Sequence, residues 1–139
     1  MQIRPFDPND LDATLALWES AELLTPHNDP RKDIARKLDH SPWGFLVMVE
    51  GDAVIGSVMA GYDGHRGWIN YLACHQEYRR RGVATALLSA AQEILSTHGC
   101  PKINLQVREG NQSAIAFYES LGYSNDTVTS FGLRLVSDG

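Results

Sequence analysis

The sequence contains little cysteine and no clustered metal ligands. Cys74 and Cys100 are the two cysteines among 139 residues, and neither belongs to a Cys-x-x-Cys or Cys/His ligand spacing. The five histidines are scattered along the chain. These gaps argue against a disulfide-stapled secreted domain and against a structural zinc site. We expect two reduced thiols and no bound metal.

Basic charge and long apolar runs are also scarce. Twelve Lys and Arg face 17 Asp and Glu, and the net charge of -5 disfavours binding to nucleic acid or an anionic membrane through overall charge. Apolar runs such as Phe45–Val49 are far shorter than the roughly 20 residues of a membrane-spanning helix. Met1 leads into polar alternation, unlike a signal peptide, and no Gly-Lys-Ser/Thr marks a P-loop. We therefore expect a cytoplasmic protein with neither nucleic acid nor membrane as partner.

Hydrophobic periodicity predicts an α/β domain with a mixed central sheet. Helix starts are expected at Asp7-Pro8, Asp29-Pro30, Val83 and Asn111, because capping side chains, prolines or a change to helical spacing occur there. Alternating or β-rich segments predict strands over residues 2–6, 45–50, 53–62, 68–74, 102–108 and 127–136. The order of these elements and a hydrophobic content of 43% favour one compact domain over residues 1–139.

Three consecutive arginines precede the third expected helix. Arg79, Arg80 and Arg81 stand directly before Gly82, where the helix start already carries about half a positive charge and unpaired N–H groups. A phosphate or pyrophosphate would remove this repulsion, and Gly82 would let the backbone approach such a ligand closely. The alternative is a solvated basic turn that binds nothing.

Two motifs resemble the GNAT acetyltransferase family. Arg79-x-x-Gly82-x-Ala84 resembles its pyrophosphate motif, and Asn111-x-x-Ala114-x-x-Phe117-Tyr118-x-x-Leu121-Gly122-Tyr123 resembles its C-terminal motif. The resemblance covers essentially the whole chain. It implies the GNAT fold: a mixed, mostly antiparallel sheet that splays between strands 4 and 5, flanked by about four helices.

The resemblance also implies an acetyl-CoA site. The strand before the arginines would hold the pantetheine arm through its backbone, as an added strand does. The arginine loop and helix start would wrap the pyrophosphate, and an N–H near Cys74 would polarise the thioester carbonyl. In this account the Cys74 thiol is not a nucleophile. The implied cofactor-binding residues are Leu72, Ala73, Cys74, Arg79, Arg80, Arg81, Gly82, Val83, Ala84 and Asn111.

Tyr118 is the catalytic residue that the resemblance implies. Its phenol would donate a proton or a hydrogen bond to the departing CoA thiolate. A phenol pKa of about 10 against a thiol pKa near 8.5 makes hydrogen-bond stabilisation as reasonable as full transfer. The alternative is a packing aromatic on an apolar helix face, the role that we assign to Phe117.

The general base is not evident from the sequence. The family places a glutamate on the fourth or fifth strand, but Trp68 and Gln106 occupy those positions. The substitutes are a water chain, an amine of low pKa, or one of the polar residues Glu50, Asp63, His65 and Glu109, each of which is also an ordinary surface group.

The acceptor implied by the resemblance is an amine of a small molecule, an amino acid or a peptide. The expected strands 45–50 and 53–62 flank the turn Gly51-Asp52 and predict a hairpin. This hairpin and the first two helices would line the acceptor site, with Trp18, His27, Asn28, Asp29, Trp43, Tyr62 and Tyr71 as candidates. A non-catalytic acyl-CoA-binding module is the competing function, since the usual carboxylates are missing. A monomer and a homodimer both fit the sequence.

Overall fold

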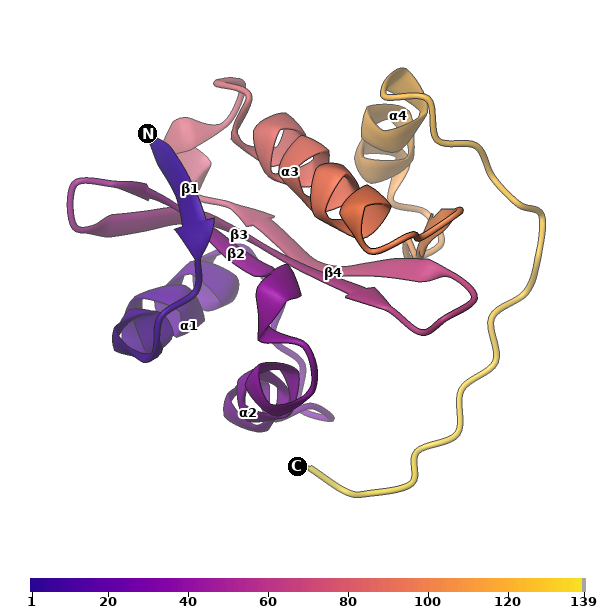
Figure 1. Cartoon of the computed structure of the whole chain (residues 1–139), viewed down its shortest axis with the longest axis horizontal. Helices are drawn as coiled ribbons and strands as arrows, with labels where there is room; N and C mark the ends of the chain where they lie inside the picture. Colours follow the sequence, from indigo (N-terminus) through magenta and orange to yellow (C-terminus); the bar gives the residue numbers. More distant parts are fainter. Residues whose placement is uncertain (139) are drawn as a thin grey trace.

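The computed structural model describes residues 1–138, which form a five-stranded sheet in chain order (Figure 1). All neighbouring strands are antiparallel except the last pair, β4 and β5, which are parallel. This arrangement confirms the mixed, mostly antiparallel sheet. The strands are β1 (Gln2–Pro5), β2 (Phe45–Glu50), β3 (Ala53–Tyr62), β4 (Gly67–Cys74) and β5 (Ile103–Leu105).

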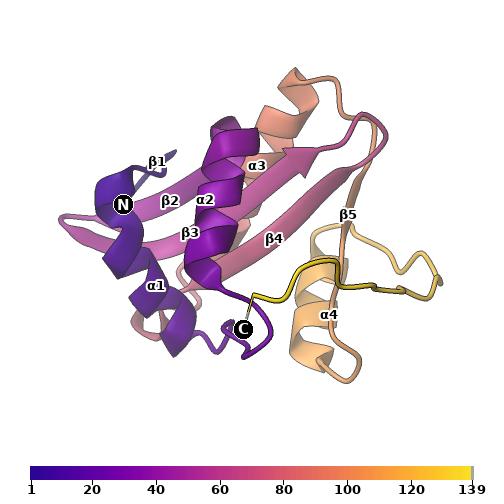
Figure 2. The same cartoon turned by 90° about the horizontal axis from the view of Figure 1, so that it is seen from below.

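Helices cover both faces of the sheet. Helices α1 (Leu11–Ser20) and α2 (Pro30–His40) lie on one face, while α3 (Val83–Thr97) and α4 (Gln112–Ser120) lie on the other (Figures 1 and 2). The predicted starts are confirmed by their caps, since the Asp29 carboxylate accepts the Arg31 and Lys32 N–H groups. Asp7 caps a short 3-10 turn that leads into α1.

Two apolar clusters, one on each face, hold these layers together. The α3 face buries Leu87 and Leu95 completely, and the opposite face buries Trp18 and Phe45 completely. Each sheet face is thus covered by side chains from a helix pair, as a layered α/β architecture requires.

The sheet splits beyond the first residues of β4. Gly67, Trp68 and Ile69 pair with β5, and the following residues of β4 have β3 alone as a neighbouring strand. At the split, Tyr71 and Leu72 together face Val58, which makes a β-bulge. Tyr71 adopts a left-handed φ of 50°, a strained conformation for a residue with a Cβ. The predicted splay between strands 4 and 5 is confirmed.

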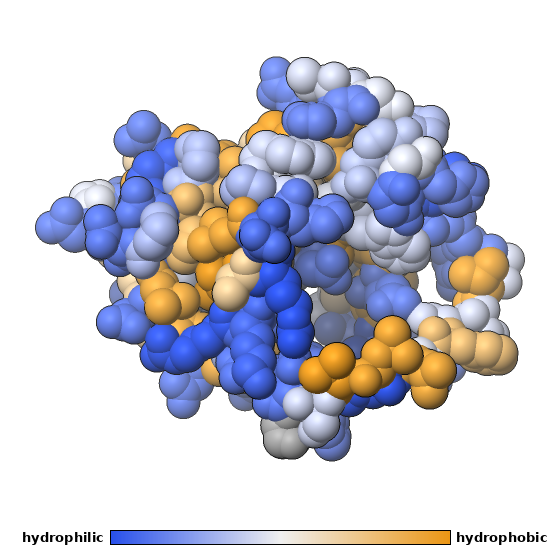
Figure 3. Space-filling view, turned by 60° about the horizontal axis from the view of Figure 1, so that its bottom comes forward, coloured by the Kyte–Doolittle hydropathy of each residue, from blue (hydrophilic) through white to orange (hydrophobic). Residues whose placement is uncertain are grey.

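The predicted strand over residues 127–136 is wrong, and the predicted strand over 102–108 is shortened to β5. The C-terminal segment 124–138, here called the C-terminal arm, is irregular and exposes Val128, Phe131, Leu133, Leu135 and Val136 (Figure 3). β5 offers only three residues for pairing, and the far end of the arm is held instead by the Arg36–Asp138 ion pair at 2.7 Å. The alternation of apolar residues in the C-terminal arm is therefore not accompanied by strand pairing.

Candidate active site

The arginine loop joins the end of β4 to the start of α3. Gly82 is the N-cap of α3 in the left-handed region at φ 79°, and Arg80 is left-handed at φ 66°. Two such residues within three positions turn the chain sharply into the helix. The first hydrogen bond from a helical N–H runs from Ala86 to the Gly82 carbonyl at 2.9 Å, so the N–H groups of the preceding turn remain available to a ligand.

The positive charges of the three arginines are not paired with acidic side chains in the described part of the chain. All are exposed, and within residues 1–138 none forms a salt bridge with a carboxylate. The Arg81 guanidinium lies 4.8 Å from the centre of the Tyr78 ring, a cation–π contact that orients it. Exposed cations beside a helix N-terminus are a combination that suits an anion.

The free edge of β4 presents backbone groups beside this loop. The N–H of His75 donates to the Ile55 carbonyl of β3 at 2.8 Å, so strand alternation turns the N–H of Cys74 away from β3 and toward the split. The side chains of Leu72 and Cys74 pack on the α3-face cluster, whereas Ala73 faces the other cluster. Burial raises the pKa of the Cys74 thiol, against a smaller opposite effect of Arg79, so the sulfur remains protonated.

Tyr118 lies on α4 over the same apolar cluster as Leu72 and Cys74. Its ring packs edge-on against the rings of Phe117 and Tyr123, with distances between ring centres of 5.1 and 5.7 Å. Burial, and then the nearby Tyr123, raises the pKa of Tyr118. The phenol therefore stays protonated above neutral pH and is able to donate a hydrogen bond to an anion.

Asn111 caps α4. Its side-chain oxygen accepts the Ala114 N–H and the Ser113 hydroxyl, both at 3.2 Å. That oxygen is committed to the helix start, and the exposed side-chain NH₂ is the part left for a ligand.

Comparison with known proteins settles the family. The acetyltransferase (GNAT) family model matches residues 12–123. The chain belongs to the GNAT acetyltransferase family. An acetyltransferase of Yersinia enterocolitica is 47% identical over 138 residues, covering 99% of this chain and 98% of the relative. This GNAT protein is accordingly an acyltransferase of the N-acetyltransferase class.

Solved structures with the same fold include two aminoglycoside-related enzymes. The aminoglycoside antibiotic 6'-N-acetyltransferase of Acinetobacter haemolyticus has a TM-score of 0.77 and 19% identity, covering 98% of this chain and 100% of its own. AAC(6')-Iy, solved with a bisubstrate analogue containing CoA, has a TM-score of 0.78 and 18% identity, covering 97% and 98%. At these identities the likeness shows the GNAT fold.

The expected base positions of this GNAT chain hold groups with structural partners. The Trp68 indole N–H donates to the Asp63 carboxylate at 3.2 Å, and Gln106 bonds to Ser130. Asp63 also accepts the His65 and Arg66 N–H groups, and these donors lower its pKa. A carboxylate so stabilised in its ionised form is a poor proton acceptor.

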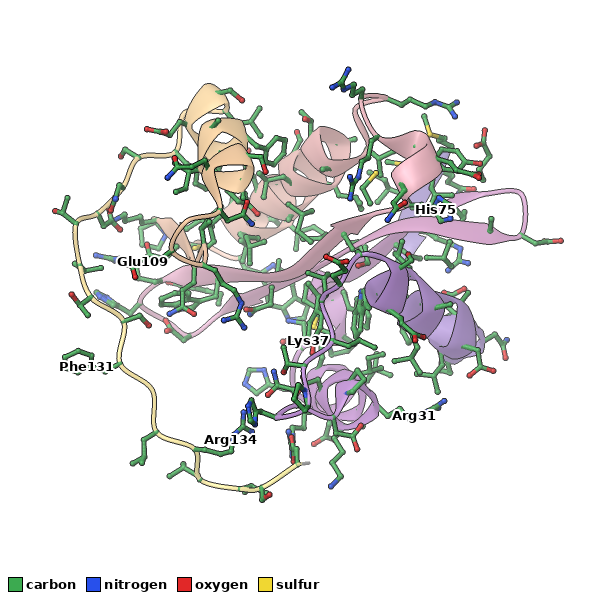
Figure 4. The ribbon with its side chains drawn as sticks, turned by 180° about the vertical axis from the view of Figure 1, so that it is seen from behind. Arg31, Lys37, His75, Glu109, Phe131 and Arg134 are labelled. Atoms are coloured by element: carbon green, nitrogen blue, oxygen red, sulfur yellow. The ribbon has the colours of Figure 1, made fainter. Side chains whose placement is uncertain are left out.

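The remaining candidate bases also lie apart from the predicted acetyl site. Glu50 ends β2 and hydrogen-bonds Tyr78, raising the pKa of that phenol. His65 is exposed in the turn before β4. Glu109 is exposed in the loop before α4 (Figure 4). Within residues 1–138, none of the three has a side-chain hydrogen bond or ion pair to β4 beyond the split.

On the acceptor side, the structure brings some predicted residues together and separates others. Trp18 is completely buried and stacks on Tyr71 with ring centres 3.9 Å apart, so it belongs to the core. Asp29 is occupied as the α2 cap, and Trp43 stacks on His98 at 3.7 Å, away from Tyr71. His27 and Asn28 are exposed before α2, and Tyr62 hydrogen-bonds the Gly64 carbonyl in the turn before β4.

One charged residue beside Tyr71 was missed by sequence reasoning. The Tyr71 hydroxyl donates to the Asp33 carboxylate at 2.6 Å. Asp33 lies in the first turn of α2, where an acidic residue is ordinarily explained by the helix dipole. A contact between residues 38 positions apart left no local signal in the sequence.

A surface cavity of about 380 Å³ lies at the opposite end of α3 from the arginine loop. Its lining includes Leu95, Cys100 and Tyr123, and none of the predicted cofactor residues. The 15 residues of α3, at about 1.5 Å each, separate the two places. Among residues 1–138 there is no group of three metal-ligating side chains and no helix long and apolar enough to cross a membrane.

Proposed function

We propose that this protein transfers the acetyl group of acetyl-CoA to an amine by direct attack on the thioester. The observation that carries the proposal is the juxtaposition of two open elements: the unpaired edge of β4 and the arginine-flanked start of α3, joined by one short loop. The first suits an extended pantetheine arm, and the second suits a pyrophosphate.

Each expected cofactor contact has a matching group. The backbone of Leu72, Ala73 and Cys74 holds the pantetheine, with the Cys74 N–H aimed at the thioester oxygen. The loop and helix start from Arg79 to Ala84 surround the pyrophosphate, and the Asn111 NH₂ binds the pantetheine or its water. The site thus pairs anionic groups of the ligand with N–H donors and guanidinium charges.

The chemistry follows from these contacts. The neutral amine nitrogen attacks the carbonyl carbon, the Cys74 N–H stabilises the developing oxyanion, and the carbon–sulfur bond breaks. The CoA thiolate leaves beside the protonated Tyr118, which donates a hydrogen bond or its proton, while the proton that the attacking nitrogen releases passes through water to the thiolate or back to Tyr118. An alkyl amine with a pKa of about 10.4 must first lose a proton at neutral pH, and water accepts it in this scheme.

The whole-chain pattern, including the turn 61–67, further resembles the small bacterial acetyltransferase YpeA. We place the protein with such enzymes as a single cytoplasmic domain over residues 1–139, acting as a monomer or homodimer. The aminoglycoside antibiotic named for one structural neighbour and the acetylneamine-containing CoA analogue bound to another support a small-molecule amine as acceptor. A non-catalytic acyl-CoA-binding module is the second candidate, favoured by Trp68 and Gln106 at the usual base positions.

A thiol-release assay across a panel of amines separates these functions. The enzyme releases free CoA thiol with at least one amine in the panel, whereas a binding module is stabilised by acetyl-CoA against heat and releases none. Calorimetric titration of acetyl-CoA into the folded protein tests the shared premise. Absence of any binding heat, with the thermal transition also unmoved, would overturn both.

A further inference from the structure

The most informative polar contact outside the predicted cofactor site is the one between Tyr71 and Asp33. The phenol donates to the carboxylate at 2.6 Å, linking β4 to the first turn of α2. Tyr71 immediately precedes Leu72, where the proposed pantetheine edge begins. Asp33 therefore lies on the α2 face of the sheet, next to the place where the sheet splits. Figure 2 shows α2 lying in front of the sheet on this face.

The phenol is held rigidly from several sides. Its ring stacks nearly parallel on Trp18, at 13° and 3.9 Å. The Trp18 indole N–H donates to the Ser57 hydroxyl at 2.8 Å, and Ser57 donates to the Tyr71 carbonyl at 2.8 Å. Ring and backbone of Tyr71 are thus fixed together, and a group bound beside its hydroxyl would meet a preorganised site.

The Asp33 carboxylate retains capacity for another partner. Its side chain is 28% exposed, and an ionised carboxylate accepts about four hydrogen bonds. Among residues 1–138, Arg36 is the one cationic side chain within salt-bridge distance of Asp33, at 3.5 Å, but the Arg36 guanidinium makes two shorter bonds to Asp138, at 2.7 and 2.9 Å. One arginine is thus shared between two carboxylates, so the negative charge at Asp33 is incompletely balanced.

The other cation that α2 turns toward the sheet is engaged elsewhere. The Lys37 ammonium donates to the Ala60 carbonyl and to the Ser41 hydroxyl, and Figure 4 shows it between α2 and the sheet. It forms no salt bridge within the described part of the chain. Asp33 accordingly has the shared Arg36 as its cationic partner, and its partly exposed carboxylate can still accept from a further cation.

We propose that Asp33 and Tyr71 bind a second, positively charged amine of the acceptor, so that the preferred acceptors are diamines or larger polyamines. An alkyl ammonium donates three hydrogen bonds, which the Asp33 carboxylate and the lone pairs of the Tyr71 oxygen accept. A full tyrosine side chain separates these atoms from the β4 backbone. The ammonium held here is therefore a different group from the amine that attacks the thioester.

This proposal rests on the proposed acetyl transfer, and it names the acceptor class. The bound ammonium keeps its charge, because an adjacent carboxylate favours the protonated form. The attacking amine, at the other end of the molecule, loses its proton to water. The competing explanation is that the Tyr71–Asp33 bond only ties α2 to β4, in which case the charge on Asp33 is immaterial.

Asp33→Asn distinguishes these explanations, because the amide oxygen still accepts the Tyr71 hydrogen bond while the charge is removed. Equilibrium binding to the full chain is measured by calorimetry with 1,5-diaminopentane and with pentylamine, which lacks the second ammonium. The parent protein should bind the diamine about 10- to 100-fold more tightly, a range typical of a charge-assisted hydrogen bond. Asp33→Asn should abolish that preference, and Asp33→Glu should restore part of it.

Asp39→Asn is the matched control, since Asp39 is an exposed carboxylate of the same helix that forms no salt bridge within residues 1–138. It should keep the full preference for the diamine. Equal binding of the two amines by the parent, or an unchanged preference in a folded Asp33→Asn variant, would overturn the proposal. Circular dichroism confirms that each variant is folded.

Binding and turnover fail separately in this design. A diamine preference that depends on Asp33, without thiol release from acetyl-CoA, would contradict the acetyl transfer and keep the ammonium site. Thiol release with no effect of Asp33→Asn on the ratio of KM values for the two amines would keep the acetyl transfer and contradict the ammonium site. Where turnover is present, Asp33→Asn should raise KM for the diamine by a larger factor than KM for pentylamine.

Discussion

The indole N–H of Trp18 donates a hydrogen bond of 2.8 Å to the Ser57 hydroxyl, between two residues that are both completely buried. The Ser57 hydroxyl in turn donates a hydrogen bond to the Tyr71 carbonyl. This relay connects α1, β3 and the bulge of β4. Because buried polar groups are expensive when unpaired, the relay holds the strained Tyr71 backbone in place at the split of the sheet.

Replacing Ser57 by Ala should therefore destabilise the protein. The change leaves the Trp18 N–H without its acceptor and removes the donor to Tyr71, so the free energy of unfolding should fall by about 1–3 kcal/mol. Urea denaturation followed by tryptophan fluorescence measures it. Unaltered stability would mean that water or a shifted side chain takes the place of the hydroxyl.

Thr14→Val should have a different outcome. The Thr14 hydroxyl is also completely buried, but it has no hydrogen-bond partner among the described residues. Replacing it with a methyl group of similar shape removes an unsatisfied polar atom, and the free energy of unfolding should stay equal or rise by about 1 kcal/mol. The same urea titration checks this, and a loss as large as that of Ser57→Ala would contradict the pairing assigned to both residues.

The sequence predicted the features that depend on neighbouring residues, but not the contacts between distant elements. The helix starts at Asp29 and Gly82 and the hairpin around Gly51 depend on local rules of capping and turn chemistry, and the structure confirms them. The contact of Tyr71 with Asp33 joins two elements through tertiary packing, for which no local pattern exists.

The C-terminal arm shows the opposite failure. Its residues Phe131, Leu133 and Leu135 alternate as a strand would, yet all three are more than four-fifths exposed. Alternation predicts a strand only where a partner edge of sufficient length is available, and β5 is three residues long. The family resemblance implied the cofactor motifs and placed Asp29, but not Asp33, among the acceptor-site candidates, because the contact of Asp33 with Tyr71 depends on tertiary packing.

Gly82→Ala tests the anion site at the start of α3. The backbone at φ 79° is strained for alanine, which costs about 1 kcal/mol of stability, although an added Cβ meets no atom within 4 Å. In the presence of a pyrophosphate the same Cβ stands beside the ligand, so the affinity for acetyl-CoA measured by calorimetry should fall about tenfold or more.

Gly99→Ala is the matched control for that change. Gly99 follows α3 at its other end, at φ 82°, with no atom within 4 Å of an added Cβ. It should cost similar stability and leave the affinity for acetyl-CoA unchanged. Equal affinity losses in the two variants would point to a general weakening of α3 and away from a phosphate contact at Gly82.

Tyr118→Phe should lower kcat and leave acetyl-CoA binding largely intact. Loss of a hydrogen bond to the leaving thiolate predicts a decrease of about 10- to 100-fold. Since burial raises the pKa of Tyr118, the parent rate should show no decline from its ionisation up to about pH 10. Tyr123→Phe removes a neighbouring hydroxyl that bonds Gln92 at 2.7 Å, and it should keep the parent kcat. A Tyr118→Phe variant as fast as the parent would remove the role assigned to that phenol.

Lys37 predicts a pH dependence of stability. Burial lowers its pKa from 10.5 to about 8. Between these two pH values the unfolded chain holds a proton that the folded chain has released, so the free energy of unfolding should rise with pH. Below about pH 8 both states hold the proton, and the cost of burying the charge is constant. Lys37→Met lacks this proton, so the stability of the parent relative to Lys37→Met should increase between pH 8 and pH 10 in urea titrations.

Lys32→Met, which removes an exposed ammonium of the same helix, is the control for this prediction. Parent and Lys37→Met curves that stay parallel across the window would show that the Lys37 ammonium, despite its bonds to Ala60 and Ser41, is solvated as well in the folded chain as in the unfolded one.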